Sequence, residues 1–105
     1  MYDTDILISR FYNGETITIE DAFNSGILHP VQRIYEIKSR CVPVVSTRDG
    51  RRKLYRIDPA VLPQIKRDVM LFQLHGRKAF TDLPVERYIS ARYIARALSR
   101  NMNES

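Results

Sequence analysis

The 105-residue sequence has one cysteine, no tryptophan and two histidines. It also has no apolar run that approaches the ~20 residues needed to cross a bilayer. The single Cys41 excludes a disulfide within the chain and a zinc site built from cysteines. His29 and His75 have no metal-ligand spacing to other candidate ligands. Only four glycines are present, and none forms a phosphate-cradling loop. We therefore expect no enzyme activity, no metal and no cofactor.

The start of the chain is acidic where a secretory signal is basic. Asp3 and Asp5 occupy this region, so we expect no signal peptide and no membrane association. Together with the single cysteine, this points to a reducing cytoplasm. The length suits one domain, and 44% hydrophobic with 28% charged residues is ordinary for a globular protein.

The net charge of +5 is unevenly distributed. Residues 1–28 carry −4, residues 29–57 carry +6 and residues 58–105 carry +3. A basic centre beside an acidic start indicates a polarised surface, which attracts polyanions such as nucleic acid. The alternative is a solvated surface without a partner.

The first half of the chain predicts helices separated by tight turns. Apolar residues four apart favour a helix over residues 5–12, and the β-branched run at 16–19 favours a short strand. Thr18 and Asp21 form a capping box for a helix over 20–25, which ends at Gly26. A third helix is expected over 29–39, with Pro30 in its first turn. Its predicted core positions are Val31, Ile34, Tyr35 and Ile37.

Two β-rich runs, 42–47 and 52–57, flank Asp49-Gly50, which is a strong hairpin signal. A two-residue turn there would place Arg48 opposite Arg51 and Thr47 opposite Arg52. The buried face would carry Val42, Val44, Tyr55 and Ile57. Like charges facing each other are destabilising, so the tip favours an anionic partner; a mobile, solvated tip is the alternative.

The last part of the chain predicts two further helices. One would open at Asp58-Pro59 and run to Leu74 with a break at Pro63, and the other would end near Asn101. On the latter, a basic ridge is expected from residues at four-residue spacing, namely Arg92, Arg96 and Arg100. This ridge would contact phosphate, dock an acidic protein or simply be solvated. The apolar stripe of the helix would complete the core or pair two subunits as a homodimer.

The order helix, strand, helix, turn, helix, hairpin is that of a winged helix-turn-helix. Within residues 6–57 the sequence combines Thr18, Ala22, Phe23, Gly26, the run Arg33-Ile34-Tyr35-Glu36-Ile37-Lys38, and Tyr55-Arg56-Ile57. With these residues it resembles the small helix-turn-helix domains of phages and prophages. Where that family has a glycine after the third helix, this chain has Cys41, so we expect the helix end either to differ or to carry some strain. The expected architecture is α+β and mostly helical, with the winged domain at 1–58 and a helical extension at 59–105.

The resemblance implies a double-stranded DNA-binding protein in a bacterial host cytoplasm, either a transcription regulator or a recombination accessory factor. The expected contacts of the recognition helix are His29, Gln32, Arg33, Glu36, Lys38 and Arg40. Those of the wing are Arg48, Arg51, Arg52 and Lys53. Competing ion pairs, Arg33 with Glu36 and Glu36 with Arg40, would weaken base readout.

A different class of function remains open. The domain would then be a protein-interaction module that binds and modulates a host protein, with the last helix carrying the contact. Single-stranded RNA is the weakest alternative, because the aromatic residues are expected mostly on core faces.

Overall fold

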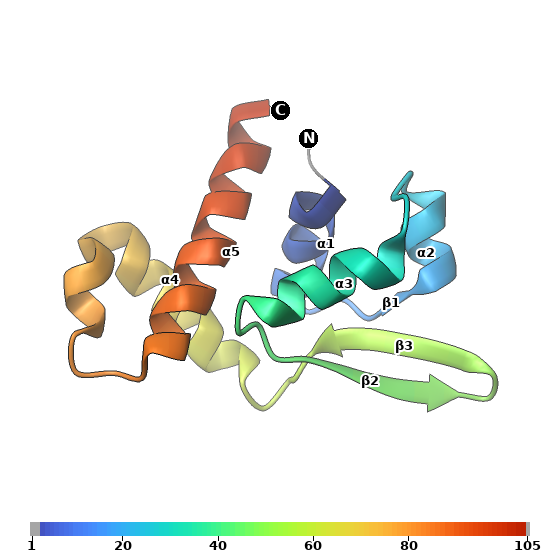
Figure 1. The fold of residues 1–105 in the computed structure, drawn as a ribbon, viewed down its shortest axis with the longest axis horizontal. Coiled ribbons are helices and arrows are strands. Elements are labelled where there is room, and N and C mark those ends of the chain that lie inside the picture. Colours follow the sequence, from blue (N-terminus) through green and yellow to red (C-terminus); the bar gives the residue numbers. More distant parts are fainter. Residues whose placement is uncertain (1–2, 105) are drawn as a thin grey trace.

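The computed structural model describes residues 3–104 (Figure 1). Its elements in chain order are α1 (Asp3–Tyr12), β1 (Ile17–Thr18), α2 (Ile19–Asn24), α3 (Pro30–Ser39), β2 (Val44–Asp49), β3 (Arg52–Ile57), α4 (Leu62–His75), the 3₁₀ helix η1 (Gly76–Phe80) and α5 (Val85–Glu104). The strands form one antiparallel sheet in the order β1-β3-β2. This confirms an α+β, mostly helical chain, whereas η1 was not predicted. None of the helices described is both long and apolar enough to span a bilayer.

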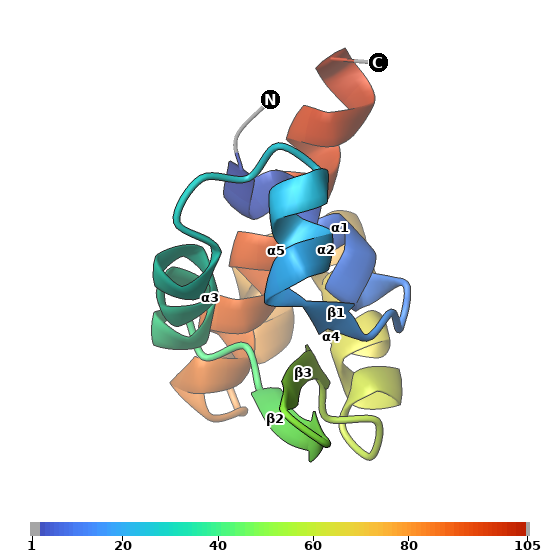
Figure 2. The same cartoon turned by 90° about the vertical axis from the view of Figure 1, so that its right-hand side faces the viewer.

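The capping box predicted for α2 is present. The Asp21 backbone N–H donates to Thr18 Oγ1, and the Thr18 N–H donates to Asp21 Oδ2, both at 3.0 Å. These two bonds satisfy donors that a helix start leaves without intrahelical partners. At the other end, Gly26 takes a φ of +84°, and the chain turns sharply into α3, which lies at a steep angle to α2 (Figure 2).

Both ends of α3 have backbone conformations that L-residues seldom adopt. His29 precedes Pro30 with a φ of +56° and makes no side-chain cap. Cys41 follows the helix with a φ of +65°. A left-handed residue other than glycine costs roughly 1–2 kcal/mol. Of the two outcomes expected at Cys41, a different helix end or strain, the structure therefore has strain.

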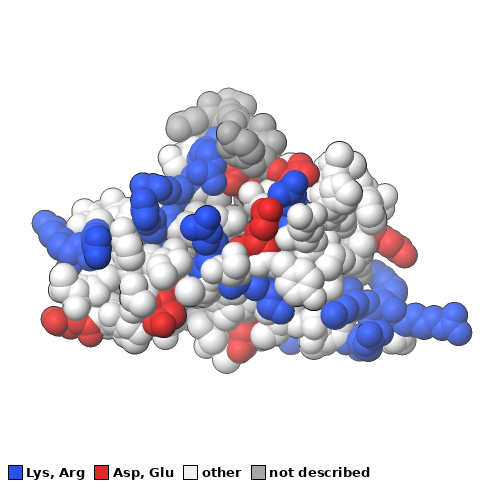
Figure 3. Space-filling view, in the orientation of Figure 1, with Lys and Arg blue, Asp and Glu red and all other residues white. Residues whose placement is uncertain are grey.

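The predicted hairpin register is wrong by two residues. The structure pairs Asp49 with Arg52 and Arg48 with Lys53, so the turn residues are Gly50 and Arg51. Gly50 has a φ of +64°, which suits a type II′ turn with glycine in the first central position. This register places opposite charges next to the turn and avoids the predicted pairing of Arg48 with Arg51. The tip projects past the N-terminal end of α3, and basic side chains gather there (Figure 3).

The prediction of which face of the hairpin is buried is nevertheless confirmed. Side chains alternate between the faces of a sheet, so a shift of two residues leaves each one on its original face. The four residues expected inside are all buried, namely Val42, Val44, Tyr55 and Ile57.

The start of α4 also differs from its prediction. Asp58 and Pro59 belong to a turn, in which the Ala60 N–H donates to Asp58 Oδ1 at 3.0 Å. The helix begins at Leu62, and Pro63 lies in its first turn. A proline is tolerated there because its missing N–H would have no intrahelical partner; Pro63 therefore does not break the helix.

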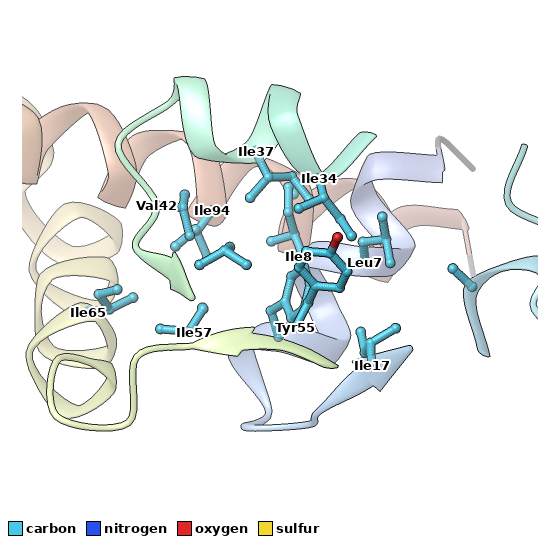
Figure 4. Close-up of a cluster of buried hydrophobic side chains, with 14 of the residues drawn as sticks. Leu7, Ile8, Ile17, Ile34, Ile37, Val42, Tyr55, Ile57, Ile65 and Ile94 are labelled. Atoms are coloured by element: carbon cyan, nitrogen blue, oxygen red, sulfur yellow. The ribbon is translucent and has the colours of Figure 1, made fainter. Parts of the chain in front are cut away.

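One hydrophobic cluster joins both halves of the chain. α1 contributes Leu7 and Ile8, whereas α4 and α5 contribute Ile65 and Ile94 (Figure 4). The C-terminal helices thus pack on the first 58 residues and share their core. Of the core positions predicted for α3, Ile34 and Ile37 are buried, as Figure 4 shows. Val31 and Tyr35 are 42% and 64% exposed, which corrects the prediction.

Two bidentate ion pairs hold α5 in place. Near its C-terminal end, Arg100 Nε and Nη2 donate to the fully buried Asp5 carboxylate of α1 at 2.7 and 2.8 Å. Near its N-terminal end, Arg87 donates to the buried Asp68 carboxylate of α4 at 3.0 and 2.8 Å. The hydrogen bonds with Asp68 raise the pKa of Arg87. Both ends of α5 are therefore tied to neighbouring helices.

Candidate nucleic-acid interface

The hairpin tip presents the four basic side chains predicted for the wing. Arg48, Arg51, Arg52 and Lys53 are all exposed. Arg48 and Lys53 face each other across the strands, a like-charge pair that costs a few tenths of a kcal/mol or more, roughly 0.2–1. Among the paired residues next to the turn, Asp49 is the one acid, and it lies opposite Arg52. The tip therefore keeps a strong positive charge that neighbouring acids only partly offset.

The exposed face of α3 is more polar than basic. Ile34 and Ile37 point into the core, which leaves Gln32, Tyr35 and Lys38 facing solvent. Lys38 Nζ lies 5.9 Å from the centroid of the Tyr35 ring. His29 is exposed at the start of the helix and has no capping contact. Of the predicted recognition residues, His29, Gln32 and Lys38 are thus available to a partner.

The remaining recognition residues contact other side chains of the protein. Arg33 Nη1 donates to Glu36 Oε1 at 2.8 Å, and the buried Arg33 Nε has no partner among the described residues. The alternative of local pairing is therefore realised for this pair. The second predicted pair, Glu36 with Arg40, is not formed. The Arg40 guanidinium instead lies 5.6 Å from the centroid of the Tyr93 ring of α5.

The predicted basic ridge on α5 divides into two parts. Arg100 pairs with Asp5 and serves to attach α5 to α1. Arg92 and Arg96 are exposed, and no ion pair joins either of them to the described residues. Sequence spacing could not reveal this division, because Asp5 and Arg100 are 95 positions apart.

Arg92 and Arg96 line a pocket that sequence reasoning missed. The pocket has a volume of about 480 Å³ and lies between the end of α3 and α5. Arg40 contributes the third guanidinium, and Tyr93 forms part of the wall. Burial raises the pKa of Tyr93, and a side-chain hydrogen bond with Thr4 acts in the opposite direction. Figure 3 shows basic side chains over this part of the molecule, on the same face as the hairpin tip.

A group of exposed apolar side chains surrounds the turn between α2 and α3. Phe23 and Leu28 are 56% and 66% exposed, and Val31 and Tyr35 follow on α3. Phe23 and Tyr35 are therefore exceptions to the prediction that the aromatic residues mostly occupy core faces. Such a surface is able to contact another protein or apolar groups of a nucleic acid.

Within the part of the chain that the structure describes, no three His, Cys, Asp or Glu side chains lie close enough together to hold a metal ion. Comparisons of the chain with protein-family models, curated proteins and solved structures find no match.

Proposed function

We propose that the chain is a winged helix protein that binds double-stranded DNA, with α2 and α3 as the helix-turn-helix and β2–β3 as the wing. It would act as a transcription regulator or a recombination accessory factor of the phage or prophage type, in a bacterial cytoplasm. The order α1-β1-α2-α3-β2-β3, the sharp turn at Gly26 and the exposure of α3 support this assignment. α3 would lie in the major groove while the wing contacts the backbone.

The observation that carries the proposal is the charge of the hairpin tip. Four exposed basic side chains surround one tight turn, and two of them are directly opposed. In the free protein this arrangement costs repulsion energy, whereas backbone phosphates would neutralise it and release counterions. A DNA backbone supplies several phosphates along each strand, so more than one side chain of the tip could contact it.

The chemistry of α3 suggests modest sequence readout. Gln32 is exposed and suits an adenine edge, and Lys38 suits guanine or a phosphate. Arg33 is tied to Glu36, so it is a poorer candidate for base contact than the sequence suggested. Most of the affinity would therefore come from phosphate contacts and would fall steeply with salt.

The test is fluorescence anisotropy with a mixed-sequence DNA duplex over a salt series. The variant Arg51→Ala/Arg52→Ala should weaken binding to all sequences alike and flatten the log–log salt slope by about 0.9 for each phosphate that it no longer neutralises. The matched control is Arg67→Ala/Lys78→Ala, which removes the same charge from exposed residues of α4 and η1. Equal effects of the two variants, or no binding by the parent at low salt, would refute the proposal.

A second candidate function is favoured by the apolar group at the α2–α3 turn. In this case the chain would bind a host protein and modulate it. The variant Val31→Ser/Tyr35→Ala removes two exposed apolar side chains and leaves the wing unchanged. Salt-insensitive binding of a host protein that this variant abolishes, with no DNA binding by the parent, would favour this candidate over the first.

A further inference from the structure

The pocket between α3 and α5 concentrates positive charge that the protein itself does not neutralise. Four arginines elsewhere pair with carboxylates, namely in Arg10–Glu15, Arg33–Glu36, Arg87–Asp68 and Arg100–Asp5. Arg40, Arg92 and Arg96 converge on one pocket, and none of them forms an ion pair with the described residues. The nearby Glu36 is occupied by Arg33. Three like charges in one hollow favour the binding of an anion.

The donor groups suit a phosphate. A guanidinium presents several N–H donors in a planar fork that matches phosphate oxygens. Arg92 and Arg96 are one turn apart on α5, so their side chains lie on the same face. Arg40 approaches from the end of α3 and is steadied by the Tyr93 ring. The pocket therefore offers donors from two helices whose relative position is set by a common core.

The position of the pocket relative to α3 gives the phosphate a source. The pocket adjoins the C-terminal end of α3, whereas the hairpin tip projects past its N-terminal end (Figure 1). A ten-residue helix is about 15 Å long, and the major groove is about 12 Å wide and bordered by a backbone on each side. Basic groups thus lie at the C-terminal end of α3 and beyond its N-terminal end, as contacts with two flanking backbones would require.

We propose that the pocket of Arg40, Arg92 and Arg96 binds a phosphate group, and that this group belongs to the DNA backbone at the C-terminal end of α3. The assignment to DNA rests on the proposed function. The wing and the pocket would then hold the helix from opposite sides of the groove, and α5 would be part of the DNA-binding surface.

The test compares Arg92→Ala/Arg96→Ala with Arg92→Lys/Arg96→Lys and with the control Arg67→Ala/Lys78→Ala, in the anisotropy salt series. The alanine variant should flatten the salt slope by about 0.9, because one phosphate is no longer neutralised. The lysine variant keeps the charge and should restore the slope, although binding stays weaker because lysine lacks the guanidinium fork. All variants should unfold at the same temperature as the parent, since neither arginine has a structural ion pair. Calorimetric titration with pyrophosphate provides a second readout of the same pocket.

The outcomes separate this inference from the proposed function. If the wing variant loses DNA affinity while Arg92→Ala/Arg96→Ala equals the parent in affinity and slope, the inference is overturned and the proposed function stands. If the parent does not bind DNA but binds pyrophosphate through the two arginines, the DNA source is overturned and a free phosphorylated compound replaces it. If the parent binds DNA and the alanine variant alone loses part of the slope, the inference holds.

Discussion

The ion pair between Asp5 and Arg100 allows a prediction with a magnitude. The Asp5 side chain is fully buried, and the Arg100 side chain is 40% exposed. Arg100→Ala leaves the buried carboxylate without its two guanidinium hydrogen bonds. Removing one partner of a buried pair costs about 3–5 kcal/mol. Because water already reaches Arg100, we expect the lower end, about 3 kcal/mol. This is a large share of the roughly 5–15 kcal/mol that stabilises a typical domain.

The assay is urea unfolding at pH 7, with the free energy of unfolding as the readout. Arg96→Ala is the matched control, because Arg96 lies one turn earlier on α5, is exposed and has no ion pair with the described residues. Its effect should stay within about 0.5 kcal/mol. For Arg100→Ala, the melting temperature should also fall by about 4 °C or more per kcal/mol.

A double-mutant cycle with Asp5→Asn isolates the energy of the pair itself. In the Asp5→Asn background, Arg100→Ala should lower the free energy of unfolding far less than it does in the parent, because no buried charge remains. Equal destabilisation by Arg100→Ala and Arg96→Ala would refute the reasoning, since Arg100 would then behave as an ordinary exposed arginine of the predicted ridge.

Four further predictions concern individual residues of the fold. Thr18→Ala removes the cap of α2 and should cost about 1 kcal/mol in urea unfolding. The hydrogen bonds from Thr18 hold the pKa of Asp21 below its usual value. The ionised Asp21 therefore stabilises the fold above pH ~4, and this stabilisation is lost as the pH falls through the lowered pKa. The melting temperatures of Asp21→Asn and the parent should differ at pH 7 and converge in acid. Cys41→Gly relieves a left-handed backbone and should raise the urea midpoint by the equivalent of about 0.5–1 kcal/mol; a lower midpoint would show that the packing of the cysteine side chain outweighs the strain. Arg87→Ala leaves the buried Asp68 without its ion-pair partner and should lower the free energy of unfolding by about 3 kcal/mol. Arg87→Lys keeps the charge and should lower it by less.

Local signals in the sequence predicted local structure well. The capping box of Thr18 and Asp21, the turn at Gly26 and the helix start at Pro30 each involve residues within a few positions of one another. The hydrogen bonds and backbone preferences that define these features involve only neighbouring residues, so they do not depend on contacts with distant parts of the chain. The buried face of the hairpin was predictable for a related reason, because it depends only on alternation along each strand.

Predictions that depend on a choice between neighbouring alternatives were less accurate. Asp49-Gly50 and Gly50-Arg51 are both possible turns, and the structure has the one that pairs Asp49 with Arg52. Helix periodicity placed Val31 and Tyr35 in the core, but the neighbours of α3 cover only a narrow stripe around Ile34 and Ile37. The width of a buried stripe depends on tertiary packing, which a periodic pattern does not contain.

The arginines show why the candidate site could be predicted only in part. Those of the wing were identified correctly as exposed, because a hairpin tip is exposed in any packing of the domain. On the helices, a pair along one helix was predictable, as for Arg33 with Glu36, whereas pairing with a distant carboxylate depends on the fold, as for Arg100 with Asp5. Arg92 and Arg96 meet none, and the end of α3 adds Arg40 to them. Four-residue spacing treats Arg92, Arg96 and Arg100 alike, whereas the fold places two of them at a pocket and pairs the third with the buried Asp5. The proposal that DNA is the partner therefore predicts that its backbone contacts the wing and the pocket on either side of α3. It also predicts that base sequence has a limited effect on affinity, because the exposed face of α3 carries little charge.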